Sequence, residues 1–137
     1  MISVMGTTGN YILQPSLVSM HQQSLEWLSV SALWKQELNF FQKLLDQNSA
    51  KATSTELKKQ MDHFQHIITY YGGEVVDGLR KKIRNHEKDL AGMLQCMNES
   101  DTQYFKNHEG VMSELLTFSK TYDQFKYEFF GFIEKMI

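Results

Sequence analysis

The stretch Ile68-Thr69-Tyr70-Tyr71-Gly72-Gly73-Glu74-Val75-Val76 decides the fold, because it places two adjacent glycines inside a long periodic segment. A glycine in a helix costs about 1 kcal/mol relative to alanine, so the pair could end a helix. The apolar positions around it nevertheless keep one face. From Leu57 to Met97 they advance 40 residues in 11 steps, close to the 3.6 residues of a helical turn. The pattern predicts one helix over residues 54–97, with a break at Gly72-Gly73 as the alternative.

Capping signals bound this segment on both sides. Thr53-Ser54-Thr55-Glu56 matches a capping box, in which the Thr53 hydroxyl and the Glu56 side chain satisfy each other's backbone amides. Ser100-Asp101-Thr102-Gln103 repeats the pattern before a third segment. In that segment the apolar positions alternate steps of 3 and 4 up to Met136, which predicts a helix that runs nearly to the last residue.

A first helix is predicted over residues 16–47, with Pro15-Ser16 as its start signal. Its heptad-like seam consists of Leu17, Met20, Ser24, Trp27, Ser31, Trp34, Leu38, Phe41 and Leu45. Further apolar residues widen the seam, so more than one neighbour should cover it: Leu25, Leu28, Leu33, Phe40 and Leu44.

Short linkers make sequential helices antiparallel neighbours. The predicted fold class is therefore all-α, with three long antiparallel helices in an up-down-up, coiled-coil-like bundle. A four-helix bundle is the alternative if the second helix breaks at Gly72-Gly73. Residues 1–15 form an N-terminal arm, and residues 16–137 form a single helical bundle domain.

Counting residues outward from the two linkers predicts which residues of neighbouring helices lie at the same height along the bundle, here called the same level, as each tryptophan. Trp34 should lie level with Ile68 and Phe132, and Trp27 level with Val75 and Phe125. Both indoles should then be largely buried. The small residues expected to make room for them are Gly72, Gly131, Ser24 and Ser31.

The composition excludes several classes of protein. A chain of 137 residues with a net charge of −2 lacks the positive excess of a dedicated nucleic-acid binder. The single cysteine, Cys96, rules out an intramolecular disulfide, and without a neighbouring base it should be inert. The first 13 residues lack the features of a signal peptide, and no apolar run reaches the roughly 18 residues of a spanning helix. We therefore expect a cytoplasmic protein.

Histidines offer the first candidate chemistry. His86 and His108 fall on the seams of the second and third helices, and with Glu87 or Glu109 they could bind a divalent metal ion. The competing interpretation, which we favour, is a pair of core histidines with ordinary hydrogen-bond partners. His63 and His66 point away from the seam and should be solvated. No Glu-x-x-His or His-Glu-x-x-His motif is present.

A basic run offers the second candidate. Its members could bind phosphate groups of RNA or of an anionic membrane surface: Arg80, Lys81, Lys82, Arg84 and Lys88. They wrap around the helix instead of lining one stripe, and acidic residues flank them, which favours a solvated face: Glu74, Asp77, Glu87 and Asp89.

The remaining candidates are a carboxylate and several aromatic residues. Glu37 flanks the first seam and is expected to be a solvated residue at its rim. Tyr70, Tyr71 and Phe130 could be partly exposed and belong to a partner surface. No motif for nucleophilic catalysis, nucleotide binding or dinucleotide binding occurs, so an enzyme is not expected.

The far end of the second helix suggests self-association. Beyond the level at which the first helix begins, Leu90, Met93, Leu94 and Met97 would face the third helix alone. Either the N-terminal arm or a second copy of the chain must cover them, and we expect a homodimer.

Several short runs resemble small bacterial helical-bundle proteins of unknown function: Glu26-Trp27-Leu28, Trp34-Lys35-Gln36-Glu37-Leu38, His63-Phe64-Gln65, Asn85-His86-Glu87 and Tyr127-Glu128-Phe129-Phe130. The resemblance spans about residue 25 to the end of the chain, and the Gly72-Gly73 pair departs from it. It supports a helical fold and implies no activity. We expect a non-enzymatic module for protein–protein interaction or self-association, with metal binding and phosphate binding as the alternatives.

Overall fold

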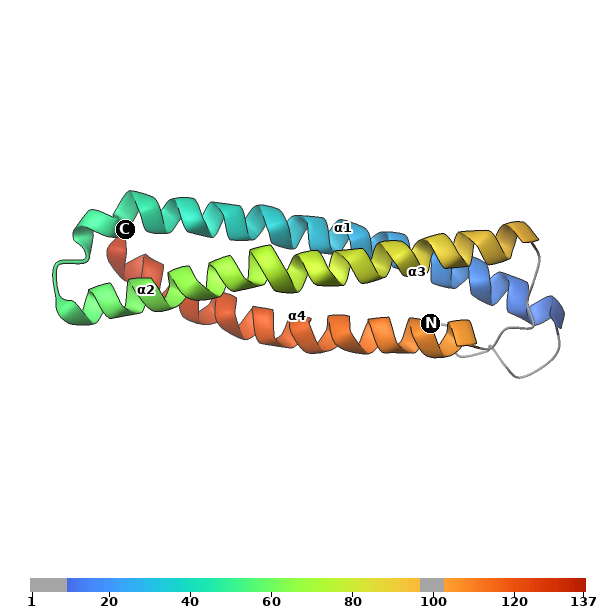
Figure 1. Ribbon diagram of the computed structural model, residues 1–137. Helices are drawn as coiled ribbons and strands as arrows, with labels where there is room; N and C mark the ends of the chain where they lie inside the picture. Colours follow the sequence, from blue (N-terminus) through green and yellow to red (C-terminus); the bar gives the residue numbers. More distant parts are fainter. Residues whose placement is uncertain (1–9, 97–102) are drawn as a thin grey trace. The chain divides into compact units, whose positions relative to one another are not determined.

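A computed structural model describes residues 10–96 and 103–137, and the side chains within 17–92 and 104–137. The described chain is all-α (Figure 1). Its α-helices are α1 (Asn10–Asn48), α2 (Thr55–Tyr70), α3 (Val76–Cys96) and α4 (Gln103–Met136). A short 3₁₀ turn, η1 (Ser49–Lys51), follows α1, and a π-helical segment, η2 (Tyr71–Val75), joins α2 to α3. None of the described helices is both long and apolar enough to cross a membrane.

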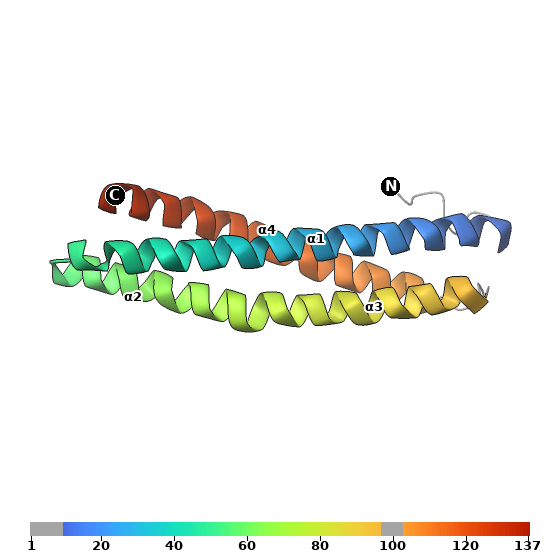
Figure 2. The same cartoon turned by 90° about the horizontal axis from the view of Figure 1, so that it is seen from above.

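The break considered at Gly72-Gly73 does not occur. Helical residues continue from α2 through η2 into α3, as the unbroken ribbon in Figure 2 shows. The glycines instead lie in a wide turn, in which the Val76 N–H donates to the Tyr71 carbonyl five residues earlier. The turn absorbs one extra residue. Seam burial accordingly moves to Val76, which is fully buried, while Val75 is only half-buried.

Two helix starts differ from the sequence prediction. The first helix begins at Asn10 instead of Ser16, so Pro15 lies inside α1. The predicted Thr53–Glu56 capping box is wrong by one position. Ser54 is the N-cap of α2, and its hydroxyl accepts from the Leu57 N–H at 3.1 Å. The predicted cap at residues 100–102 lies outside the described residues.

The chain divides into two compact units, which are described separately. Unit 1 contains residues 1–31 and 79–114, as far as these are described. Unit 2 contains residues 32–78 and 115–137.

The core of unit 2 is aromatic. Trp34 is 7% exposed, and its indole lies 5.1 Å from the Phe118 ring and 5.8 Å from the Tyr122 ring. The prediction that Trp34 is buried is confirmed. Its contacts fall ten or more residues before Phe132 on α4, so the predicted level is wrong. Further down the unit, Phe41 and Phe64 pack on Phe129 with ring centroids 4.8 Å and 5.6 Å away.

The glycines do not make room for the indoles. A Cβ on Gly72 would lie 3.8 Å from Leu38, and one on Gly131 would meet no described heavy atom within 4 Å. That prediction is wrong because it inherited the shifted helix levels. Three of the five widening residues of α1 are also misplaced, since Leu25, Leu33 and Phe40 are 45–56% exposed, whereas Leu28 and Leu44 are half-buried.

The core of unit 1 is smaller and partly polar. Leu17, Met20 and Leu90 form a buried cluster that Tyr104 and Phe105 cover in part. Leu90 is therefore not the uncovered residue that the dimer argument assumed, because Leu17 and Met20, both inside the predicted first helix, lie at its level. The side chains of Met93, Leu94, Cys96 and Met97 lie outside the described residues.

The two seam serines of α1 are fully buried and hydrogen-bonded to their own helix. The Ser24 hydroxyl donates to the Met20 carbonyl at 2.9 Å, and the Ser31 hydroxyl donates to the Leu28 carbonyl at 3.0 Å. Their small size leaves space on the inner face of α1 within unit 1. For Ser31, that space holds a polar side chain rather than an indole, as described below.

Candidate functional site

Unit 1 brings together the two histidines that the sequence singles out. His86 on α3 and His108 on α4 are 5% and 2% exposed, and His86 Nε2 lies 2.9 Å from His108 Nδ1. His108 Nε2 lies 2.7 Å from Oε1 of Gln23 on α1. Three helices therefore contribute to one buried hydrogen-bonded chain.

The amide oxygen of Gln23, at the end of this series of hydrogen bonds, determines which nitrogen of each imidazole carries a hydrogen. An amide oxygen can only accept, so His108 Nε2 carries a hydrogen and donates to Gln23. A neutral His108 then accepts at Nδ1, and the hydrogen between the rings belongs to His86 Nε2. This assignment follows from the hydrogen-bond network, with the Gln23 amide placed so that its nitrogen faces the Met112 sulfur at 4.0 Å.

Burial keeps both imidazoles neutral. Burial, with a positive charge on His86 as the smaller cause, lowers the pKa of His108 from 6.5 to about 4. Burial also lowers the pKa of His86, although the Asp89 carboxylate partly opposes the shift. The pair is therefore uncharged at neutral pH and can take up a proton only in acid.

Trp27 belongs to this site instead of the aromatic core. Its indole stacks on the His108 ring, with centroids 4.6 Å apart and planes 25° apart, and it remains half-buried. The predicted level of Trp27 with Val75 and Phe125 is wrong, because its ring partner is His108, and the indole is less completely buried than that of Trp34. The indole covers one face of the histidine that is bonded to Gln23.

The predicted carboxylate ligands do not join the histidine pair. Glu87 Oε1 lies 3.4 Å from His21 Nδ1, within ion-pair range but without hydrogen-bond geometry, and Glu109 is exposed. Within the described residues, no group of three or more His, Cys, Asp or Glu side chains is arranged to hold a metal ion. His63 and His66 are exposed on α2, as predicted.

The basic run separates into residues with different environments. Arg80 is half-buried, and its guanidinium donates at 2.7 Å to both the Leu28 carbonyl and the Ser31 hydroxyl. Lys82 forms an ion pair with Glu114 at 2.7 Å. Lys81, Arg84 and Lys88 are exposed on α3. The five residues therefore do not form one basic stripe, and Arg80 stabilises the inside of unit 1.

A groove of about 360 Å³ opens beside the histidine pair between α3 and α4. Its wall contains His86 and charged groups of both signs, including Lys82, Asp89, Lys106 and Glu114. Because the lining carries both positive and negative charges, it does not favour a ligand of one particular charge. The chemistry that the geometry supports in unit 1 is proton uptake in acid.

Unit 2 presents a second candidate, an aromatic cluster in which two exposed rings, Phe40 and Phe130, lie beside the buried Phe41. The buried Phe41 ring lies 6.4 Å from Phe40 on the same helix and 5.4 Å from Phe130 on α4. Phe40 and Phe130 nevertheless remain 56% and 47% exposed. The sequence predicted the exposure of Phe130 and Tyr70, but placed Phe40 in the core.

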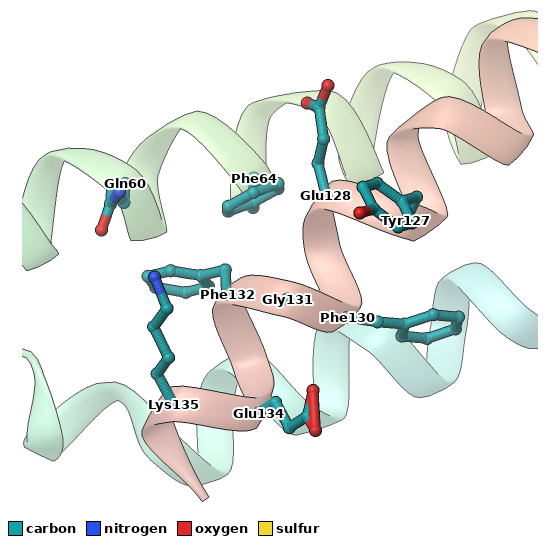
Figure 3. Close-up of a pocket in the computed structure, with 9 residues that line it drawn as sticks. All are labelled: Gln60, Phe64, Tyr127, Glu128, Phe130, Gly131, Phe132, Glu134 and Lys135. Carbon is teal, nitrogen blue, oxygen red and sulfur yellow. The ribbon is translucent and has the colours of Figure 1, made fainter.

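A groove of about 580 Å³ adjoins this cluster, bordered by α2 and α4 (Figure 3). Tyr127 and Phe130 project from α4 at one end, and the bare backbone of Gly131 lies between Phe130 and Phe132. Tyr127 is 77% exposed. Gln60 and Phe64 of α2, with Glu128, Glu134 and Lys135 of α4, complete the lining.

Glu37 is more than a rim residue. It is half-buried and accepts a hydrogen bond from the Tyr122 hydroxyl at 2.9 Å, while Lys126 Nζ approaches at 3.4 Å. Burial and the nearby carboxylate raise the pKa of Tyr122, so its hydroxyl stays protonated and donates. Glu37 therefore serves as the hydrogen-bond acceptor for the buried Tyr122 hydroxyl.

The chain matches no known family model, and no curated protein or solved structure was found to be similar to it.

Proposed function

We propose that this chain is a non-enzymatic helical module that associates with a second copy of itself through the apolar face of unit 2. The observation that carries the proposal is the pair of large exposed rings, Phe40 and Phe130, which both lie near the buried Phe41 ring. Clustered exposed aromatic residues are typical of interaction surfaces, because they release much apolar area from water when a partner covers them.

The proposed scaffold is an antiparallel up-down-up bundle. Contacts in unit 2 support this order, since Gln42 bonds to Gln65 while Lys35, earlier on α1, bonds to Gly72. The pairs in unit 1 run in the same direction. Leu28 of α1 contacts Arg80 of α3, and His21, earlier on α1, pairs with Glu87, later on α3. Between α3 and α4, Lys82 pairs with Glu114 and His86 with His108.

The oligomeric mass tests this proposal. Sedimentation equilibrium of the full chain should show a dimer whose population rises with protein concentration. Phe130→Ser should shift the chain toward the monomer, because it removes an exposed ring of the cluster. Tyr70→Ser is the matched control, since it removes a ring that is 53% exposed on α2 and outside the cluster. A monomeric mass for the unmodified chain at several hundred micromolar would overturn the proposal.

A further inference from the structure

The outer face of α4 in unit 2 carries a second periodic seam. Its positions alternate steps of 4 and 3: Leu116, Lys120, Asp123, Tyr127, Phe130, Glu134 and Ile137. All of them are exposed, and they lie on the side of the helix away from its buried residues. Ile137 continues the helical backbone, because its N–H donates to the Ile133 carbonyl. A regular 3–4 repeat is the spacing that lets two helices pack along a common line.

We propose that two copies of the chain pair through this seam, with the α4 helices antiparallel and Tyr127 on the two-fold axis. The inference rests on the proposed function, that the chain self-associates, and it names the contact. The seam is self-complementary in this one arrangement. Leu116 then lies opposite Ile137 of the second copy, and Lys120 lies opposite Glu134 of the second copy.

Charge selects this arrangement over the parallel one. A parallel pair would place Lys120 against Lys120, Asp123 against Asp123 and Glu134 against Glu134, so like charges would meet at three levels of the seam. The antiparallel pair removes all three like-charge contacts and places Lys120 against Glu134 at two levels related by symmetry. No ion pair joins Lys120 or Glu134 to another described residue, so both remain available.

The remaining positions tolerate the pairing. Asp123 would lie opposite Phe130 of the second copy, but its carboxylate already lies 3.9 Å from Lys126 of its own helix. Gly131 lies level with Asp123 of the second copy, and because it has no side chain the two helices can approach closely there. Tyr127, 77% exposed, would be the most strongly buried side chain of the interface.

The length of the seam fits a weak dimer. Residues 116–137 extend about 33 Å at 1.5 Å per residue. A single pair of helices over this length gives an interface at the small end of specific complexes. We therefore expect a dissociation constant of about micromolar magnitude.

Cysteine crosslinking tests the geometry, in a Cys96→Ser background that removes the chain's single native cysteine. Tyr127→Cys should form a covalent dimer under mild oxidation, because only this position meets itself across the axis. Thr117→Cys is the matched control, since it is exposed on α4 but would lie about 30 Å along the axis from its copy. A mixture of Lys120→Cys and Glu134→Cys chains should crosslink, and neither chain should do so alone.

A charge exchange gives an independent measurement. Lys120→Glu and Glu134→Lys should each weaken the dimer about tenfold in sedimentation equilibrium, and the double variant should restore it. All substituted residues are exposed, so helical circular dichroism should be unchanged.

The outcomes separate the two proposals. A dimer that crosslinks at Lys120→Cys alone, or fails to crosslink at Tyr127→Cys, overturns the antiparallel α4 contact and leaves self-association standing. A monomer at all concentrations overturns both.

Discussion

Acid should destabilise this protein through the buried histidine pair. In an unfolded chain a histidine titrates near pH 6.5, whereas burial lowers the pKa of His108 to about 4. Between these values the unfolded state binds a proton that the folded state excludes. Stability is therefore complete above pH 6.5 and falls as the pH drops toward 4.

The magnitude follows from the size of the shift. Each pKa unit corresponds to 1.36 kcal/mol, so His108 contributes about 3 kcal/mol in full and about 2 kcal/mol between pH 8 and pH 5. With a urea dependence of about 2 kcal/mol per molar, the unfolding midpoint should fall by about 1 M over that range. The lowered pKa of His86 acts in the same direction.

Two measurements check this expectation. Urea unfolding at a series of pH values gives the slope, and NMR titration of the imidazole protons gives the pKa of each ring directly. His108→Gln should flatten the slope, because glutamine does not titrate. His63→Gln, an exposed histidine on α2, should leave it unchanged. Equal slopes in the unmodified chain and in His108→Gln would refute the reasoning.

Three further variants test other contacts by urea unfolding. Trp34→Ala should cost about 3–5 kcal/mol, and Trp27→Ala clearly less, because Trp34 is buried between two rings and Trp27 is half-buried; equal costs would contradict the assigned environments. Arg80→Met should cost about 1–3 kcal/mol, because the Ser31 hydroxyl oxygen loses its Arg80 donor and the Leu28 carbonyl keeps only the donors of its own helix. The exposed Lys81→Met should change stability by less than about 0.5 kcal/mol. Deletion of Gly73 should leave the chain folded, since it removes only the extra residue of η2, while deletion of Lys58 should unfold it by rotating the seam of α2 by about 100°; the opposite order would show that the wide turn is needed.

The sequence predicted which side of each helix is buried far better than which residues meet. The 3–4 spacing on α1 and α4 correctly identified Leu38, Phe41, Phe125 and Phe129 as core, because spacing depends on one helix alone. Levels between helices depend on where the chain turns between them, and the prediction placed the first turn too early: Trp34 was expected level with Ile68, whereas its neighbour Lys35 bonds to the Gly72 carbonyl. The errors for Trp27 and Leu90 follow from such shifts in level.

The polar interior was harder to foresee. The hydrogen bond between His108 and Gln23 joins residues 85 positions apart, and no periodicity links them. The only signal for Gln23 is its position beside the seam residue Ser24. The wide turn is detectable in the sequence. The seam residues Tyr71, Val75, Leu79 and Ile83 are each four residues apart, whereas the spacing elsewhere in this segment alternates between three and four. An average over the whole segment concealed this single extra residue.

That extra residue has a consequence for how such a chain can diverge. An insertion in the middle of a packed helix ordinarily turns every later side chain to the wrong side, and selection removes it. Here the backbone confines the insertion to one turn, where Lys35 of α1 reaches the Gly72 carbonyl at 3.0 Å and the Asp77 carboxylate at 2.8 Å. A lineage carrying this turn can gain or lose one residue there while keeping its inherited core. Homologues that differ in length by a single residue at the glycine pair would therefore be expected to share the same buried positions.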